Sequence, residues 1–355
     1  MRSFLLSSVF ALMLTLSFAQ GKVEEKIFVA PSIQSNKGGE DPNRKLVIYL
    51  PPGYEKSQQR YPTLYFLHGY AIDAGDMMGW MEFNKLMDSA IAGGKIRPMI
   101  LVLPSSMTTY FGSFYTNSSV TGNWADYIGQ DVVEYMDRNY RTIANRNSRG
   151  LFGHSMGGNG VLKIAMQFAD QFSVAYALSP GAMGFSDEFG LSNPAFKRVY
   201  KQTNLDSLRT VAPYYDFNKF PFFEMLYVSL ARSYSPNANE KLMQADQPIR
   251  YVGDNMEVNA EVLKKWEANF PINMIEDHLP ALKSLTALKM DWGRNEDFKH
   301  IPATNLQFSK RLESLGVKHF AEEYIGDHAN MIGGFEGRIF TEALPFFEKY
   351  LKNEK

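Results

Sequence analysis

The stretch Gly153–Gly158, which reads GHSMGG, constrains the fold of this chain more than any other part of it. It contains the spacing G-x-S-x-G, follows the apolar pair Leu151 and Phe152, and precedes a helix-like run. A serine on such a tight strand-to-helix turn is held in a strained backbone that lifts its hydroxyl above the sheet, and the glycines leave room for the turn. The spacing alone often marks a mere connection, but these flanks favour catalysis. Ser155 is therefore the candidate nucleophile.

Backbone amides on two sides of this serine are the candidate oxyanion donors. The helix expected directly after Ser155 directs the N–H of Met156 and the positive end of its dipole toward a negative oxygen on a substrate. The second donor is expected on the loop after the apolar run Thr63–Leu67, at the backbone N–H of Tyr70. We interpret His68, which begins that loop, as a structural histidine, because what the loop needs to contribute is a backbone donor.

Strand and helix signals alternate along the rest of the chain. Apolar runs bounded by turn residues predict strands at residues 26–30, 44–50, 63–67, 99–104, 173–178, 285–290 and 318–325, with the nucleophile strand beginning at 149. Helical spacing predicts helices at 80–92, 125–140 and 302–315, the last with Leu306, Phe308 and Leu312 facing inward. This alternation predicts an α/β fold with a mainly parallel central sheet and helices on both faces.

A long segment near the middle of the chain separates two of the predicted strands. Residues 182–284 are too many for an ordinary crossover, and they contain amphipathic stretches at 221–232 and 258–269. We interpret them as a mostly helical insertion that caps the active site and shapes its entrance; a docking surface for a partner is the alternative. The catalytic domain then comprises residues 20–181 and 285–355.

Residues 1–19 have the features of a secretory signal peptide. Arg2 supplies a positive start, Phe4–Phe18 is an apolar stretch too short to span a bilayer comfortably, and small residues precede a cleavage site near Ala19. A retained membrane anchor is the alternative, which the short apolar length disfavours. No other apolar run approaches a membrane span, so the mature protein is expected to be secreted or periplasmic, without stable membrane insertion.

Composition removes several function classes. The chain contains no cysteine, which excludes disulfides, thiolate metal sites and a cysteine nucleophile. Its formal net charge is −1 and it has no long basic run, so nucleic acid is not an expected partner. The oligomeric state does not follow from these features.

The base and the acid that a serine nucleophile needs occur later in the chain. Where the nucleophile sits on a G-x-S-x-G turn, the chain order is serine, acid, histidine. His328 has that position, on the loop that leaves the last predicted strand, and a carboxylate-bearing turn, Asp291–Phe298, follows the strand before it. The remaining histidines are His68 and His154, which belong to the motifs above, and His278, His300 and His319, which we expect to be solvated or structural.

These motifs together resemble the putative esterase family of α/β-hydrolases, which includes feruloyl esterases, S-formylglutathione hydrolases, enterochelin esterases and mycolyltransferases. The matching pieces are Tyr49–Tyr54 (YLPPGY), Tyr61–Gly69 (YPTLYFLHG), Gly153–Gly158, the turn at Gly293 and Gly326–His328 (GDH). They run from about residue 44 to the C-terminus and miss only the leader and the insertion. The resemblance implies an α/β-hydrolase fold and an ester-hydrolysing serine triad that needs no metal or organic cofactor. Its residues, carried onto this chain, are Ser155 and His328, with Met156 and Tyr70 as oxyanion donors.

The acid is where the sequence departs from the family. The family usually places aspartate three residues after the turn glycine, Gly293, and here that position is Glu296, followed by Asp297. Some relatives use glutamate, so Glu296 is acceptable by register, whereas Asp297 keeps the commoner residue type at the cost of a one-residue shift. We favour Glu296 and leave Asp297 open, and we expect Asp291 to be a strand-end hydrogen-bonding residue.

The sequence therefore predicts an exported serine carboxylesterase. Its partner is expected to be a small-molecule or polysaccharide-linked ester with feruloyl or acetyl groups, because residues 105–124 form an aromatic loop over the strand ends. Its rings can stack on a sugar or an aromatic acyl group, or form the loop's own small core. They are Tyr110, Phe111, Phe114, Tyr115 and Trp124. An acyltransferase on the same triad and a catalytically weak carbohydrate-binding protein are the alternatives.

Overall fold

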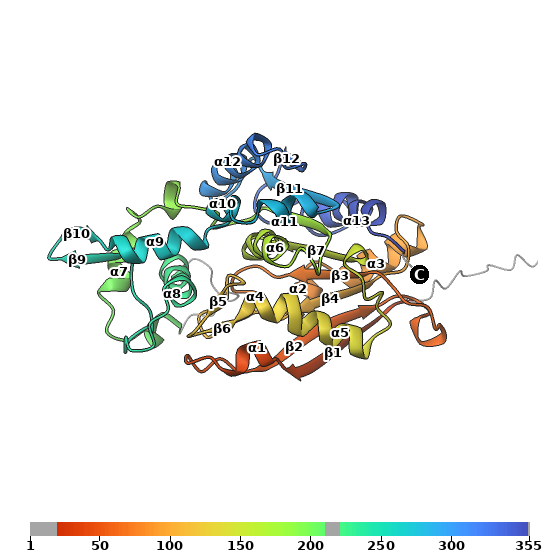
Figure 1. Ribbon diagram of the computed structural model, residues 1–355, viewed down its shortest axis with the longest axis horizontal. Coiled ribbons are helices and arrows are strands. Elements are labelled where there is room, and N and C mark those ends of the chain that lie inside the picture. The colour runs from red at the N-terminus through yellow and green to blue at the C-terminus, as the bar shows by residue number, and fades with distance from the viewer. Residues whose placement is uncertain (1–19, 210–220, 354–355) are drawn as a thin grey trace, which may run out of the picture.

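The computed structural model of the protein describes residues 20–209 and 221–353. Residues 1–19, where the sequence predicts a signal peptide, lie outside the described residues. At the centre is an eight-stranded sheet with the strand order β1-β2-β4-β3-β7-β8-β11-β12 (Figure 1). The strands are β1 (Lys22–Val29), β2 (Asn43–Leu50), β3 (Thr63–Leu67), β4 (Ile100–Pro104), β7 (Arg149–His154), β8 (Val174–Leu178), β11 (Ala287–Gly293) and β12 (Phe320–Tyr324).

Most neighbouring strands of this sheet run parallel. In the described sheet the pairs β1–β2 and β2–β4 are antiparallel, and the five other pairs are parallel. The predicted mainly parallel sheet is confirmed. One boundary differs, because β11 continues to Gly293, so Asp291 belongs to the strand rather than to the turn after it.

Helices and two short strand pairs complete the described fold. The helices are α1 (Pro31–Gln34), α2 (Ala74–Trp80), α3 (Phe83–Ala92), α4 (Trp124–Asp126), α5 (Val133–Asn139), α6 (Met156–Gln167), α7 (Pro194–Tyr200), α8 (Phe222–Tyr234), α9 (Ala260–Asn269), α10 (Pro271–Met274), α11 (Leu279–Ser284), α12 (His300–Ser314) and α13 (Leu344–Tyr350). The short pairs are β5 (Asn117–Ser118) with β6 (Gly122–Asn123), and β9 (Ile249–Val252) with β10 (Asn255–Val258). None of the helices in the described ranges has both the length and the apolar character that a bilayer span requires.

Strand β3 shows why helices cover both faces of the sheet. Side chains alternate along a strand, so Leu64 and Phe66 enter one hydrophobic cluster while Tyr65 and Leu67 enter the other. The first cluster includes residues of α3 and α13, and the second includes residues of α6 and of the helical segment 124–139. Burying each such large side chain stabilises the fold by about 1.5–3 kcal/mol. A sheet covered by helices on one face only would leave the side chains of its other face in water and lose this stabilisation.

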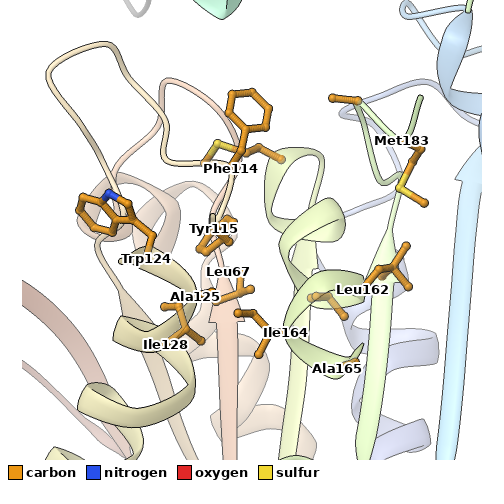
Figure 2. Packing of buried hydrophobic residues seen from close by; sticks show 14 of the residues in the cluster. Leu67, Phe114, Tyr115, Trp124, Ala125, Ile128, Leu162, Ile164, Ala165 and Met183 are labelled. Carbon is orange, nitrogen blue, oxygen red and sulfur yellow. The ribbon is translucent and has the colours of Figure 1, made fainter. Parts of the chain in front are cut away.

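The packing around α6 fixes the start of that helix. Figure 2 shows Ile164 of α6 near Leu67 at the end of β3 and near Ala125 and Ile128 of the neighbouring helix, and all four belong to one buried cluster. The helix predicted over 125–140 is present as α4 and α5, joined by a π-helical segment at Tyr127–Val132. Apolar contacts on two sides therefore hold α6, and with it the residue that precedes its first turn.

The prediction for α12 was wrong at one residue. Phe308 and Leu312 are fully buried, but Leu306 is 47% exposed. Residues two apart on an α-helix point to nearly opposite sides, whereas residues four apart share a face. Leu306 and Phe308 therefore cannot both face the core.

Residues 182–284 join two adjacent strands of the sheet. β8 and β11 pair directly, with Val174 opposite Ala287, so the described part of the intervening segment adds no strand between them. It carries α7 to α11 and the β9–β10 pair, of which α7, α8, α9 and the strand pair lie at one end of the molecule, beyond the sheet (Figure 1). The predicted amphipathic stretches correspond to α8 and α9. The division into a catalytic domain and a cap remains a prediction.

Candidate active site

Ser155 occupies the turn between β7 and α6. β7 ends at His154, α6 begins at Met156, and Ser155 has a φ of 60° and a ψ of −117°. Positive φ in a residue with a side chain is strained by roughly 1–3 kcal/mol and persists only where the surroundings impose it. Here the buried strand β7 and the buried helix α6 hold Ser155 in this conformation. The strained turn therefore places the serine hydroxyl at the strand ends.

Two glycines after Ser155 are required by the close approach of neighbouring backbones. A Cβ atom on Gly157 would lie 1.9 Å from the carbonyl oxygen of Leu67, at the end of β3. A Cβ atom on Gly158 would lie 2.8 Å from the carbonyl oxygen of Leu178, at the end of β8. The strands that flank β7 thus leave no room for a side chain in the first turn of α6, which explains the GHSMGG pattern physically.

His328 links Ser155 to a buried carboxylate. Its Nε2 lies 2.9 Å from the Oγ of Ser155, and its Nδ1 lies 2.7 Å from Oε2 of Glu296. Glu296 is fully buried. An imidazole with a carboxylate on Nδ1 carries its proton there, which leaves Nε2 as the acceptor for a serine hydroxyl. The geometry is that of a nucleophile, a base and an orienting acid.

The loops that carry the acid and the base are joined by backbone contacts. Arg294 donates its backbone N–H to Tyr324 O at 2.8 Å, and Asn295 donates to Gly326 O at 2.9 Å. A Cβ atom on Gly293 would lie 2.4 Å from that same Gly326 oxygen. The glycine at the turn therefore lets the loops after β11 and β12 meet, which brings Glu296 to His328 across 32 positions of sequence.

The other two candidate carboxylates lie in different environments. Asp297 is exposed at the entrance to the site. Asp291 is fully buried, accepts hydrogen bonds from Tyr176 and Arg338, and its pKa is raised to about 6 because burial outweighs the nearby guanidinium. Its contacts are those of a hydrogen-bonding residue within the strand. Among the described residues, no group of three or more metal-ligating side chains is arranged to hold a metal ion.

His154 holds the loop that carries His328, a contact that the sequence did not indicate. Its Nε2 donates to the backbone carbonyl oxygen of His328 at 2.8 Å. The side chain is buried, and burial, with a contribution from the adjacent His328, lowers its pKa to about 3. His154 is therefore neutral at ordinary pH and holds the loop that carries His328.

His68 is the structural histidine that its position suggested. Its Nδ1 lies 2.8 Å from Gly69 O, and its Nε2 accepts the backbone N–H of Ser106 at 2.7 Å. With both ring nitrogens engaged and the side chain fully buried, it ties the loop after β3 to the segment after β4.

The amides of Tyr70 and Met156 flank Ser155. Both residues line the same small cavity as Ser155, and neither backbone N–H has an acceptor among the described residues. The loop of Tyr70 is held against the 105–124 loop, because its phenol donates to Tyr110 O at 2.9 Å and Ala71 donates its N–H to Phe111 O at 3.0 Å. Both N–H groups therefore lie beside the serine without an acceptor among the described residues, and their role as oxyanion donors stays a prediction.

Two spaces of different size meet at Ser155. The first, here called the inner cavity, has a volume of about 30 Å³, and its lining includes Ser155, Met156, Gly181, Leu226, His300 and Ile301. The second, here called the outer hollow, has a volume of about 1060 Å³, and its lining includes Ser155, His328, Ile72, Asp76, Trp80 and Asp297. Three further residues, Tyr70, Phe222 and Phe298, line both.

His300, which we expected to be solvated or structural, forms part of the inner cavity. Its Nδ1 lies 2.7 Å from Oε1 of Glu188, and its Nε2 accepts the N–H of Ala182 at 3.3 Å. Burial raises the pKa of Glu188, but the hydrogen bond from His300 outweighs it, and the pKa lies below its usual value. Sequence reasoning missed this pair because its members are 112 positions apart.

The rings of the 105–124 loop mostly form that loop's own core. Phe114, Tyr115 and Trp124 are at most 1% exposed, and Figure 2 places them above the apolar packing around α6. Phe114 also lines the inner cavity. Internal packing therefore describes these three rings. Of the three, Phe114 alone lines the cavity, so it is the one placed to stack on a substrate.

Comparisons with known proteins agree on one family. A family model described as "Putative esterase" matches residues 40–332. An endo-1,4-beta-xylanase/feruloyl esterase of Xylanibacter ruminicola is 30% identical over 138 residues, which are 38% of this chain and 19% of that protein. An esterase of Mycobacterium tuberculosis is 32% identical over 148 residues, 41% of this chain and 30% of that protein. The chain thus spans less than a third of the length of these curated relatives.

A solved structure supports the fold over most of the chain. A ferulic acid esterase superposes with a TM-score of 0.61 at 18% sequence identity, covering 93% of this chain and 99% of that chain. At this identity the likeness establishes the fold alone. The predicted α/β-hydrolase fold is confirmed.

Proposed function

The chain belongs to the putative esterase family, and from that membership we propose that it is an exported serine carboxylesterase. The observation that carries the proposal is the hydrogen-bonded series Ser155, His328 and Glu296, with both links at 2.9 Å or less. This series needs no metal or organic cofactor to activate the serine.

The chemistry follows from the positions of these groups. Ser155 Oγ attacks the ester carbonyl carbon while His328 Nε2 takes its proton, and Glu296 stabilises the imidazolium that forms. The amides of Met156 and Tyr70 hold the oxyanion. His328 then protonates the departing alcohol, leaving an acyl-enzyme, and a water activated by the same histidine releases the acid.

Glu296 is the acid in this proposal. Its buried Oε2 lies on His328 Nδ1, whereas Asp297 is exposed. The departure from the family at the acid position is the one sequence feature that favours a binding protein without turnover. The contact between Glu296 and His328 argues against that alternative, because a glutamate at the family's register reaches the base.

The proposal extends to localisation and substrate. The leader at 1–19 supports export, and residues 182–284 act in it as a cap over the site. Feruloyl or acetyl esters on polysaccharide are the proposed substrate class, supported by the feruloyl esterase in the name of the xylanase relative. An acyltransferase remains distinguishable from it by product analysis with a sugar or lipid acceptor present.

The test is covalent labelling of the mature protein with a fluorophosphonate probe, followed by mass mapping. Labelling at Ser155 that disappears in Ser155→Ala, together with hydrolysis of short acyl esters by the wild type alone, is the expected result. A folded wild type that neither labels nor hydrolyses any short acyl ester would sink the proposal.

A further inference from the structure

Residues 179–182 (SPGA), here called the 179–182 segment, follow β8 and lie directly against the nucleophile. Gly181 donates its backbone N–H to the carbonyl oxygen of Ser155 at 3.2 Å. A Cβ atom at Gly181 would lie 3.9 Å from Ser155 Oγ, so the segment also borders the serine hydroxyl. Ser155 has a positive φ, a conformation that persists only where neighbouring groups impose it. The position of Gly181 therefore helps to set the position of Ser155.

The 179–182 segment has an uncommon backbone conformation of its own. Ser179 and Ala182 have φ values of 41° and 53°, which residues with side chains rarely adopt. Each of the three backbone N–H groups of the segment has an acceptor. The acceptors are Asp291 O for Ser179 at 2.7 Å, Ser155 O for Gly181 at 3.2 Å, and His300 Nε2 for Ala182 at 3.3 Å. Of these three acceptors, His300 alone contributes a side chain, so a substitution can remove its contact.

The carbonyl oxygens of the segment are held by buried amides. Asn159 of α6 donates its Nδ2 to Gly181 O at 3.0 Å and to Ala182 O at 2.9 Å. Asn305 of α12 donates its Nδ2 to Pro180 O at 2.8 Å. Both asparagines are fully buried. The segment is thus held between α6 and α12, and the position of Gly181 depends on both helices.

Glu188 determines which nitrogen of His300 can accept a hydrogen bond. Its Oε1 lies 2.7 Å from Nδ1 of His300 and also accepts the backbone N–H of His300 at 3.3 Å. Because the pKa of Glu188 lies below its usual value, the group is a carboxylate at neutral pH. A carboxylate can only accept, so the neutral imidazole carries its proton on Nδ1 and leaves Nε2 as an acceptor. This is the tautomer that the Ala182 N–H requires.

Two imidazole–glutamate pairs therefore border Ser155, and they do different work. In each pair the glutamate on Nδ1 leaves Nε2 as the acceptor. Nε2 of His328 faces Ser155 Oγ, whereas Nε2 of His300 faces the backbone N–H of Ala182. His328 thus contacts the reacting atoms, and His300 acts on them through the 179–182 segment.

We infer that Glu188 and His300 form a positioning pair for Ser155. Glu188 fixes the tautomer of His300, and His300 holds the 179–182 segment against the carbonyl of the strained serine. This inference rests on the proposed function, because it concerns how the reactive serine is held. Glu188 belongs to residues 182–284, which the sequence predicts to be an insertion. That insertion then contributes a residue that sets the geometry of the nucleophile.

Two substitutions of His300 separate positioning from simple packing. In His300→Gln the amide oxygen can reach the place of Nε2 and accept the Ala182 N–H, whereas in His300→Asn it reaches only the place of Nδ1. His300→Gln is expected to keep kcat for 1-naphthyl acetate near the wild-type value. His300→Asn is expected to lower kcat by about 10- to 100-fold with KM little changed, because a displacement of about 1 Å at the reacting groups can cost about 100-fold. Equal kcat in the two folded variants, whether high or low, would overturn the inference.

Glu188→Gln tests the carboxylate, with a control at the adjacent position. A glutamine amide can donate to Nδ1 as well as accept from it, so it no longer fixes the tautomer of His300. We expect kcat to fall by about tenfold in Glu188→Gln. Asp187→Asn, which neutralises an exposed carboxylate, should leave kcat as in the wild type. A Glu188→Gln protein with wild-type kcat would contradict the role of the carboxylate.

The tautomer of His300 can be measured directly in the folded wild type. Long-range ¹H–¹⁵N NMR of the histidine rings distinguishes Nδ1–H from Nε2–H, and the signal that disappears in His300→Gln identifies His300. We expect Nδ1–H in the wild type and a detectable share of Nε2–H in Glu188→Gln. Nε2–H in the wild type would refute the inference, because a protonated Nε2 cannot accept the Ala182 N–H.

Fluorophosphonate labelling of Ser155 distinguishes failure of this inference from failure of the proposed function. The labelling rate is expected to be lower in His300→Asn than in His300→Gln, because the probe reacts with the serine itself. A labelled wild type with equal rates in the two variants would refute the positioning pair alone. A folded wild type that is unlabelled and inactive would refute the proposed function.

Discussion

Glu296 and Asp297 are adjacent in the chain but differ in what they contact. Glu296 is buried on His328, and Asp297 is exposed along the outer hollow. Glu296→Gln keeps the shape but loses the charge that holds the imidazole tautomer, so kcat should fall about 10³- to 10⁴-fold. Asp297→Asn should change KM and leave kcat as in the wild type, because Asp297 lines the outer hollow and does not contact His328. Steady-state kinetics on 1-naphthyl acetate decide this, and the reverse pattern would move the acid to Asp297.

His154 gives the protein a predictable weakness in acid. Its folded pKa is about 3, below the value of about 6.5 expected in an unfolded chain. Between these two pH values the histidine is protonated in the unfolded chain but not in the folded protein. The free energy of unfolding therefore decreases as the pH falls from about 6.5, by up to about 1.4 kcal/mol per pH unit. His154→Gln keeps a donor for the His328 carbonyl without titrating. Urea unfolding from about pH 7 to 5 should show a shallower decline in the variant than in the wild type; equal slopes would rule out this role for His154.

At the scale of elements, Lys163 joins helix α6 to the 105–124 loop and to helix α8. Its buried Nζ donates to Thr116 Oγ1 at 2.6 Å in the 105–124 loop and to Tyr234 OH at 3.2 Å in α8. Burial lowers its pKa well below the usual value. The unfolded chain therefore holds this proton to higher pH than the folded protein, and stability rises with pH until the unfolded lysine also titrates.

Lys163→Met should abolish that alkaline gain. We expect the unfolding temperature of the wild type to rise more between about pH 7.5 and about pH 9.5 than that of Lys163→Met. Only the wild type carries the lysine whose pKa is lowered by folding. Lys310→Met, a change at an exposed lysine of α12, serves as the control and should behave as the wild type. If the unfolding temperatures of Lys163→Met and the wild type change equally between these pH values, folding does not lower the pKa of Lys163.

The elements near the nucleophile were the most predictable from sequence. The continuous apolar run of β3, which is buried on both faces, and the glycines around Ser155 are local patterns, and the backbone approaches at Gly157 explain why glycine is needed there. The predictions that were wrong concern positions where the local sequence pattern does not determine the structure. Leu306 was placed inward by its apolar character alone, and the end of β11 was placed too early because Asp291 resembles a turn residue until Arg338 is seen beside it.

At the scale of the whole molecule, the unpredicted parts of the site are its long-range contacts. His154 reaches the His328 carbonyl across 174 positions, and Glu188 reaches His300 across 112. Neither pair leaves a spacing signal in the chain. The meeting of Ser155, Glu296 and His328 was predictable because parallel strands place the loops that follow them at one edge of the sheet. The volumes on the two sides of Ser155, by contrast, depend on packing among elements from across the described chain.

The predicted signal peptide at residues 1–19 would set the compartment in which the whole molecule works. If residues 1–19 are a signal peptide, the exported protein begins at Gln20, because signal peptidase requires small residues one and three positions before the cut. Ala19→Arg should then leave the uncleaved precursor, whereas Ser17→Ala keeps a small residue and should be processed normally. Intact-mass measurement of protein from the periplasm, the medium and the membrane fraction distinguishes these forms. A wild type that keeps residues 1–19 and fractionates with membranes would establish the anchor instead, and would place the same esterase site at a membrane surface.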